Sequence, residues 1–144
     1  MRRRPLLSAS LAFALAGLAT VGAGCSKPAP EQSQAGAALG AVTAAVTAAT
    51  GYDASKLEVA APGAQIMVKV INSPLAGRPA IEREGEAQRI ASAISASIAG
   101  KPEFSGLLGI HVDYVTRNSD GGERVIDGVD FRKDSVGAFV PHIS

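Results

Sequence analysis

His111 and Asp113 carry the side-chain types that a proton-transfer or metal site needs, and they lie two residues apart. In an extended strand such residues point to the same face, about 7 Å apart along the chain. A histidine beside a carboxylate can act as a base with its orienting partner, and the same two groups can ligate a metal. The pair therefore predicts either hydrolysis by a small enzyme or the binding of a metal or another ligand.

The residues around this pair favour a simpler interpretation. Opposite charges on neighbouring strands form modestly stabilising pairs, and the two predicted strands here carry Asp113, Arg117, Arg124, Asp130 and Arg132. A catalytic or metal site needs convergent ligands or an activated nucleophile. The sequence shows neither, so we expect a solvated, charged sheet face with no metal and no cofactor.

Other motifs in the chain predict structure rather than chemistry. Asp127-Gly128-Val129-Asp130 could suggest calcium, but it lacks the spaced acidic loop and terminal glutamate of an EF-hand, so we expect a strand with a glycine bulge. Residues 118–122 predict a turn, and His142 predicts a surface side chain. The sequence has no phosphate-binding or dinucleotide-binding glycine motif, no nucleophile elbow and no Cys/His cluster. Ser92, Ser95 and Ser97 are expected to form the polar face of a helix.

The first 25 residues have the layout of an export signal. Three arginines at positions 2–4 precede an apolar stretch, residues 6–21, that has no ionisable side chain. Val21-Gly22-Ala23-Gly24 then leads to Cys25, the only cysteine in the chain. A positive segment, an apolar segment and small residues before a cleavage site are typical of signal peptides.

This segment resembles the signal peptide of a bacterial lipoprotein, with the residues before Cys25 in place of the lipobox. The resemblance implies cleavage before Cys25 and acylation of its thiol, which would hold the protein at a membrane. Ser26 rather than aspartate follows, which in Gram-negative lipoproteins implies transport to the outer membrane, facing the periplasm. Two alternatives stay open: cleavage by an ordinary signal peptidase, and an uncleaved anchor, since about 18 apolar residues can span a bilayer.

The rest of the chain predicts a tether and one domain. Residues 25–36 contain no large apolar side chain, so we expect a flexible tether, and residues 37–144 suit a single small domain. Removing residues 1–24 takes away three arginines and no acid, so the formal net charge changes from +1 to −2. This balance argues against a nucleic-acid partner, which normally needs a basic surface. With Cys25 acylated, the domain would have no thiol for a disulfide or for catalysis.

Hydrophobic spacing predicts the elements that position these residues. Apolar residues recur at helical spacing over 37–50 and 79–98, and Gly100 and Pro102 end the second helix. Alternating residues predict two hairpins, one of 57–59 with 66–70 and one of 110–115 with 125–131. The order is α-β-β-α-β-β. We expect an α+β two-layer sandwich, with two helices packed on one face of an antiparallel four-stranded sheet.

Together these inferences predict a lipid-anchored envelope protein that is not an enzyme. Its expected partners are the membrane, through the acyl group on Cys25, and another envelope protein or a cell-wall component. The expected contact surface is the uncovered sheet face around His111, Asp113, Arg117, Arg124 and Arg132. The alternative is a small envelope hydrolase, or a ligand- or metal-binding module, that uses His111 and Asp113 on the same face.

Overall fold

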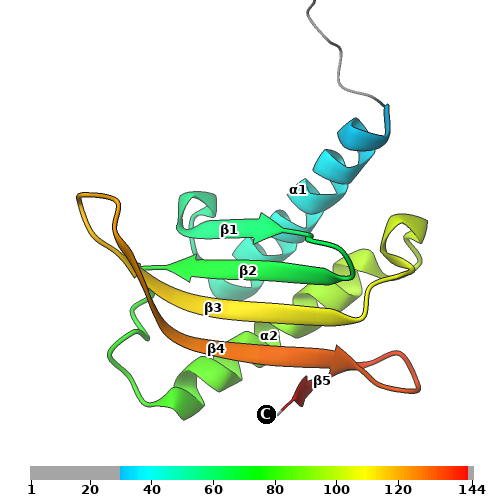
Figure 1. Cartoon of the computed structure of the whole chain (residues 1–144). Helices are drawn as coiled ribbons and strands as arrows, with labels where there is room; N and C mark the ends of the chain where they lie inside the picture. Colours follow the sequence, from blue (N-terminus) through cyan, green and yellow to red (C-terminus); the bar gives the residue numbers. More distant parts are fainter. Residues whose placement is uncertain (1–29, 143–144) are drawn as a thin grey trace, which may run out of the picture.

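The computed structural model describes residues 30–142, with side chains from Gly36 onward. Two helices, α1 (Pro30–Thr50) and α2 (Ala80–Ile98), lie against one face of a five-stranded sheet (Figure 1). Two single-turn helices are η1 (Ala54–Lys56) and η2 (Pro102–Phe104). The strands are β1 (Leu57–Ala60), β2 (Gln65–Ile71), β3 (Gly109–Arg117), β4 (Glu123–Lys133) and β5 (Phe139–His142).

The hydrophobic core fills the space between the helices and the sheet. Alternate residues of the central strands point toward the helices, as a half-buried strand requires, and these include Ile66, Val68, Val70, Ile110, Val112 and Tyr114. The helices add apolar side chains at helical spacing, namely Val42, Val46, Ala87, Ile90, Ala91, Ile94 and Ile98. The sheet residues between these strand positions form the other side of the sheet, which we call the open face.

The predicted second helix is confirmed. α2 follows Pro79 and ends at Ile98, and the apolar residues of the predicted stripe are buried, together with Arg83 and Glu86, which the sequence did not predict to be buried. Gly100 has a φ of +72°, a left-handed conformation that glycine adopts without strain. Pro102 then begins η2. Helix α2 thereby runs from the end of β2 to the segment before β3.

The predicted sheet is wrong in two respects, its strand count and its strand directions. Both predicted hairpins are present, because β1–β2 and β3–β4 are antiparallel. However, β2 and β3 are parallel neighbours, and the strand order is β1-β2-β3-β4-β5. The α2 connection explains the difference: a helix that crosses the sheet returns the chain to the same end, so the next strand runs parallel. The sheet is therefore mixed.

The fifth strand, β5, was not predicted. It has only four residues and contains Pro141, which has no backbone N–H to donate to a neighbouring strand. β5 lies at the edge of the sheet and pairs antiparallel with the end of β4. A proline is tolerated at such an edge. Phe139 anchors the strand by adding its ring to the core.

The first helix begins earlier than the sequence predicts. α1 starts at Pro30 rather than at residue 37, so it extends into the segment predicted as a tether. The predicted signal peptide, Cys25 and residues 26–29 lie outside the described residues. Among the helices that the structure describes, none is both long enough and apolar enough to cross a bilayer.

Candidate functional site

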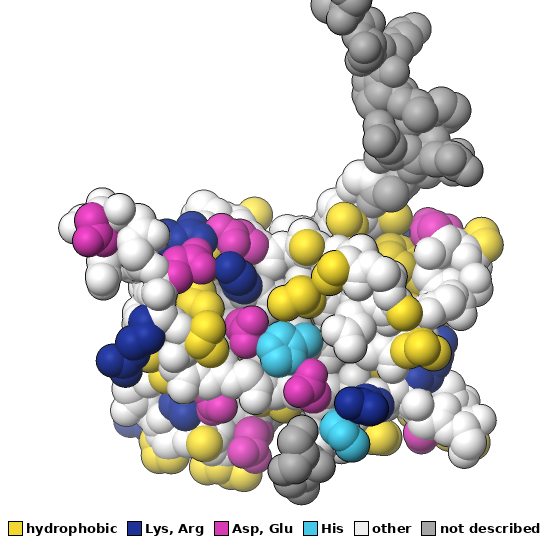
Figure 2. All heavy atoms as spheres, viewed as in Figure 1, with side chains coloured by type: hydrophobic (Ala, Val, Ile, Leu, Met, Phe, Trp, Pro, Cys, Tyr) yellow, Lys and Arg dark blue, Asp and Glu magenta, His cyan; other side chains and the backbone are white. Residues whose placement is uncertain are grey.

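The open face carries two groups of titratable side chains. Figure 2 shows a histidine between two acidic groups near the middle of this face, and a mixed group of acidic and basic side chains toward the β3–β4 turn. We call the first group, His111, Asp113 and Asp130, the histidine centre. We call the second group the ion network; it consists of Glu58, Lys69, Arg117 and Glu123.

Strand register builds the histidine centre. His111 and Asp113 are on β3, and Asp130 lies directly opposite His111 on β4. The His111 ring contacts both carboxylates: Nδ1 is 2.8 Å from Asp130 Oδ1, and Nε2 is 2.8 Å from Asp113 Oδ1. His111 and Asp113 therefore meet directly, although the strand spacing alone predicted a separation of about 7 Å.

Gly128 leaves the room that this arrangement needs. It lies opposite Asp113 on β4. A Cβ atom at this position would be 3.1 Å from Asp113 Oδ1 and 3.3 Å from His111 Cε1. Both distances are shorter than ordinary van der Waals contact, so a larger residue would push against the ion pair. The glycine in the motif 127–130 thus serves the histidine centre.

Two carboxylates favour the charged form of His111. Partial burial lowers the pKa of His111, but the hydrogen bonds to Asp130 and Asp113, with the charges of both groups, outweigh it, so that the pKa is raised above its ordinary value. In the imidazolium form both ring N–H groups donate, one to each carboxylate. The formal charge of the centre is then −1. The two carboxylates therefore stabilise the protonated His111 ring, which disfavours its action as a base.

This geometry leaves His111 without a free ring nitrogen. In a nucleophilic site one ring nitrogen faces a carboxylate and the other faces the nucleophile. Here Asp130 and Asp113 occupy both nitrogens. Within residues 30–142, no group of three or more His, Cys, Asp or Glu side chains is arranged to hold a metal ion.

The ion network joins four strands. Lys69 Nζ on β2 is 2.9 Å from Glu123 Oε2 on β4 and 3.9 Å from Glu58 Oε2 on β1. Arg117 on β3 binds Glu58 at 2.5 Å and also pairs with Glu123. Hydrogen bonds from Arg117 and then Lys69 lower the pKa of Glu123. The two acids and two bases balance, so the network is neutral.

The structure separates the other predicted residues from these two groups. Arg124, Arg132 and His142 are exposed, and within the described part of the chain Arg124 and Arg132 form no ion pair, so their predicted cross-strand pairs are not found. The predicted turn at 118–122 is confirmed by two backbone hydrogen bonds, from Asn118 N–H to the Gly122 carbonyl and from Gly121 N–H to the Asn118 carbonyl. In the motif 127–130, the Asp127 carboxylate pairs with Arg83. Asp127 and Asp130 therefore do not form a shared cation site. Ser92 and Ser97 donate to backbone carbonyls of α2.

A buried polar cluster beneath α2 was missed by sequence reasoning. The Tyr52 hydroxyl is 3.0 Å from Ser73 Oγ and donates to Glu86 Oε2 at 3.0 Å. Arg83 donates to Asp127 at 2.8 Å and to the carbonyls of Leu75 and Arg78. We call Tyr52, Ser73, Arg83, Glu86 and Asp127 the buried polar cluster. A signal was present: Arg83 precedes Ala87 by four residues, which places a charged residue on the apolar stripe of α2.

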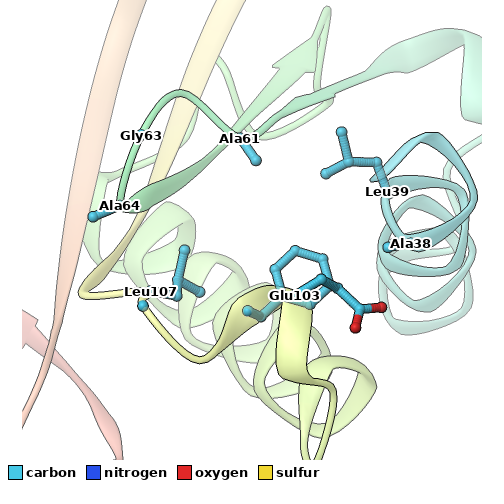
Figure 3. A pocket seen from close by; sticks show the side chains of 9 residues that line it. Ala38, Leu39, Ala61, Gly63, Ala64, Glu103 and Leu107 are labelled. Atoms are coloured by element: carbon cyan, nitrogen blue, oxygen red, sulfur yellow. The ribbon is translucent and has the colours of Figure 1, made fainter. Parts of the chain in front are cut away.

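Two pockets bear on the search for a binding site. One of about 410 Å³ lies at the β4–β5 edge, where Asp130 and His142 line it but His111 and Asp113 do not. The other, of about 360 Å³, lies between α1, the β1–β2 turn and the η2 segment (Figure 3). Its lining is mostly apolar, and Glu103 is its single charged lining residue among those described. Neither pocket contains the complete histidine centre.

No family model and no curated protein matches the chain.

Proposed function

We propose that this protein is a lipid-anchored envelope protein that binds another envelope protein or a cell-wall component through its open face. The observation that supports this most is the open face itself. Helices cover one side of the sheet, while the other side presents ordered, partly exposed ion pairs across four strands. Such a surface offers charged groups in fixed positions, and fixed charges favour specific recognition.

The anchoring part of the proposal comes from the sequence. Cys25 follows a segment with the layout of a lipoprotein signal, and acylation of this single cysteine would give stable membrane attachment if two or more chains are added. By this proposal the mature protein begins at Cys25. Ser26 favours the outer membrane, facing the periplasm, in a host that has one.

The alternative, a small hydrolase that uses His111 and Asp113, receives less support from the geometry. Its base would need a ring nitrogen that faces a nucleophile, but Asp130 and Asp113 are at hydrogen-bond distance from the two ring nitrogens. Of the three residues of the histidine centre, only Asp130 lines the nearby pocket at the β4–β5 edge. Loss of turnover in a folded His111→Ala variant would nevertheless favour this alternative, and a metal bound to the purified protein would favour the metal-binding one.

The anchoring proposal is tested by expressing the full chain in a bacterial host and comparing it with Cys25→Ala. We expect the wild-type protein to fractionate with membranes and its intact mass to show loss of residues 1–24 plus acyl groups. Cys25→Ala should lack the acyl mass. A wild-type protein that is soluble, or that keeps residues 1–24, would contradict the proposal.

The binding proposal is tested by charge reversal on the open face. Arg117→Glu changes the ion network, and Asp113→Lys changes the histidine centre. Glu82→Lys on α2 is the matched control, because it reverses a charge on the helix layer. We expect wild type and Glu82→Lys to be retained equally on purified cell-wall material or to co-purify with the same envelope protein, and the two open-face variants to be retained less. Equal retention of all four folded proteins would refute the open face as the contact surface.

A further inference from the structure

The pocket between α1, the β1–β2 turn and η2 is built from apolar groups. Ala38 and Leu107 are buried at 6% and 4% exposure, and Leu39 and Phe104 are half-buried around them. In Figure 3 the side chains of Leu39, Ala61 and Leu107 border the same space from three different elements. This chemistry suits a hydrocarbon chain rather than a polar ligand.

The edge of the pocket is charged. The Glu103 carboxylate lies at this edge and is exposed, and in Figure 3 it points toward α1. An adjoining hollow shares Ala38 and Glu103 with the pocket and is also lined by Lys101. Glu103 therefore lies at the edge of the pocket, and Lys101 lies in the hollow beside it. An apolar interior with an acid at its edge and a base in the adjoining hollow suits an amphiphile with a zwitterionic headgroup.

The pocket lies at the end of the molecule where α1 begins. The β1–β2 turn and the segment after α2 are on this same side (Figure 1). Leu108 adds to the apolar surface there: it is 64% exposed, and its backbone N–H donates to the Ala64 carbonyl at 2.8 Å. An exposed leucine next to an apolar pocket extends the surface that a hydrocarbon phase could contact.

The chain length between Cys25 and the pocket limits how far the pocket can lie from an anchored Cys25. Ala38 lies eight residues after Pro30, which is about 12 Å along a helix. The five steps from Cys25 to Pro30 reach at most about 17 Å. With Cys25 acylated, the pocket would therefore lie within about 30 Å of the bilayer surface. The bilayer is then the nearest source of hydrocarbon chains.

We propose that this pocket binds one acyl chain of a phospholipid from the membrane to which the protein is tethered. The apolar residues hold the chain, and Lys101 and Glu103 face the headgroup. The inference rests on the proposed lipid anchoring. It adds a second, non-covalent contact with the membrane, which orients the domain so that the open face remains available to a partner.

The absence of tryptophan from the sequence allows a direct test. Phe104→Trp places a single indole in the pocket, and Val125→Trp places one on the open face, where Val125 is 59% exposed. Each variant is expressed from the full chain, and the processed protein is reconstituted into phosphatidylcholine vesicles whose acyl chains carry bromine, a quencher of indole fluorescence. Flotation of the vesicles reports anchoring separately. We expect several-fold stronger quenching for Phe104→Trp than for Val125→Trp.

A pocket-filling pair of variants sharpens the test. Ala61→Phe, added to Phe104→Trp, should fill the pocket and remove most of the additional quenching. Ala60→Phe is the matched control, because Ala60 is adjacent, exposed and not part of the pocket lining. Equal effects of the two would overturn the proposal.

The remaining outcomes distinguish this proposal from lipid anchoring. Protein that floats with the vesicles but shows equal quenching at both positions overturns the pocket proposal and leaves the anchoring intact. Protein that does not float overturns both. Dibromostearic acid in solution is the second probe: quenching of Phe104→Trp by this probe but not by brominated vesicles would overturn the membrane as the source of the chain.

Discussion

The buried polar cluster and the ion network contain the same kinds of groups in opposite surroundings. In the buried polar cluster, Arg83 and Glu86 are 8% and 5% exposed, and their partners come from a loop, a strand and the segment after α1. In the ion network, the side chains of Lys69 and Arg117 are 35% and 34% exposed. Both sets join elements that are far apart in the sequence.

The difference in exposure determines what each set can do. A buried charge that loses its partner cannot be rehydrated, so the buried polar cluster fixes α2 and the 72–79 loop to the sheet. An exposed charge exchanges a protein partner for water at little cost. The ion network is therefore free to exchange its contacts for those of a binding partner. The histidine centre is intermediate, because its side chains are partly buried.

The largest effect should come from breaking the Arg83–Asp127 pair. Arg83→Met keeps most of the aliphatic stem but removes the donor to Asp127 and to the Arg78 carbonyl, while the Leu75 carbonyl keeps its hydrogen bond from the Arg78 backbone N–H. The Asp127 side chain is 27% exposed, so water reaches part of its carboxylate, and we expect the free energy of unfolding to fall by about 2 kcal/mol. Urea denaturation followed by circular dichroism measures it.

Two further variants distinguish a buried pair from an exposed one. Arg78→Met breaks the exposed Arg78–Glu82 pair and should leave the stability nearly unchanged. Adding Asp127→Asn to Arg83→Met should recover part of the loss, because no unpaired carboxylate remains. If Arg78→Met destabilised the protein as much as Arg83→Met, burial would not be what separates the two regions.

The second-largest effect should come from Tyr52. Tyr52→Phe removes the hydroxyl that contacts Ser73 and donates to Glu86. Glu86 is buried, so the loss of a donor should cost about 1–2 kcal/mol in the free energy of unfolding. Ser73→Ala should cost less, because the Tyr52–Glu86 hydrogen bond remains. A Tyr52→Phe variant as stable as wild type would show that water replaces the hydroxyl as the donor to Glu86. The buried polar cluster would then be accessible to solvent.

The sequence predicted the elements of this fold better than their arrangement. The stripe from Ala87 to Ile98 identifies α2 because these residues of the helix pack into the apolar core. The parallel pairing of β2 with β3 depends on how a whole helix crosses the sheet, and no local pattern encodes it. β5 is too short, and too unusual with Pro141, to give an alternating signal.

The candidate site was predictable only in part, for a similar reason. His111 and Asp113 share a strand, so their common face follows from a period of two. The contact with Asp130, and the need for Gly128 opposite Asp113, depend on strand register. A one-residue change of register would move Asp130 to the other face of the sheet. In the motif 127–130, Asp127 faces α2, where it pairs with Arg83, whereas Asp130 lies on the open face.

A smaller effect, dependent on pH, is expected at His111. Its pKa in the folded protein is raised: partial burial lowers it, but hydrogen bonds to Asp130 and Asp113 outweigh that. Folding therefore stabilises the imidazolium. This contribution is fully present below the pKa of the unfolded residue, about 6.5, and is lost as the pH rises through the higher pKa of the folded state.

Comparison with His111→Gln across this pH range measures the contribution. The stability advantage of wild type should shrink as the pH rises. NMR titration of the ring should give a midpoint above the ordinary value, and Asp130→Asn or Asp113→Asn should each lower that midpoint. His142→Gln identifies the second histidine signal, since the chain has only two histidines. If the pKa of His111 were at or below that of an unperturbed histidine, its carboxylate contacts would not stabilise the folded protein. The histidine centre would then no longer be intermediate between the buried polar cluster and the ion network.

The smallest effect should come from Arg117, although its side chain pairs with two carboxylates, as that of His111 does. Arg117→Ala removes contacts with Glu58 and Glu123, yet Lys69 remains within 2.9 Å of Glu123 and 3.9 Å of Glu58. Both acids also remain accessible to water, so the loss in stability should be small and should disappear as salt screens the charges. Urea denaturation at low and at high salt measures this, with Arg83→Met as the reference whose loss should persist at high salt. If the Arg117→Ala loss also persisted at high salt, the ion network would belong with the buried polar cluster as part of the fold, and the open face would lose the exchangeable charges on which partner binding is proposed to depend.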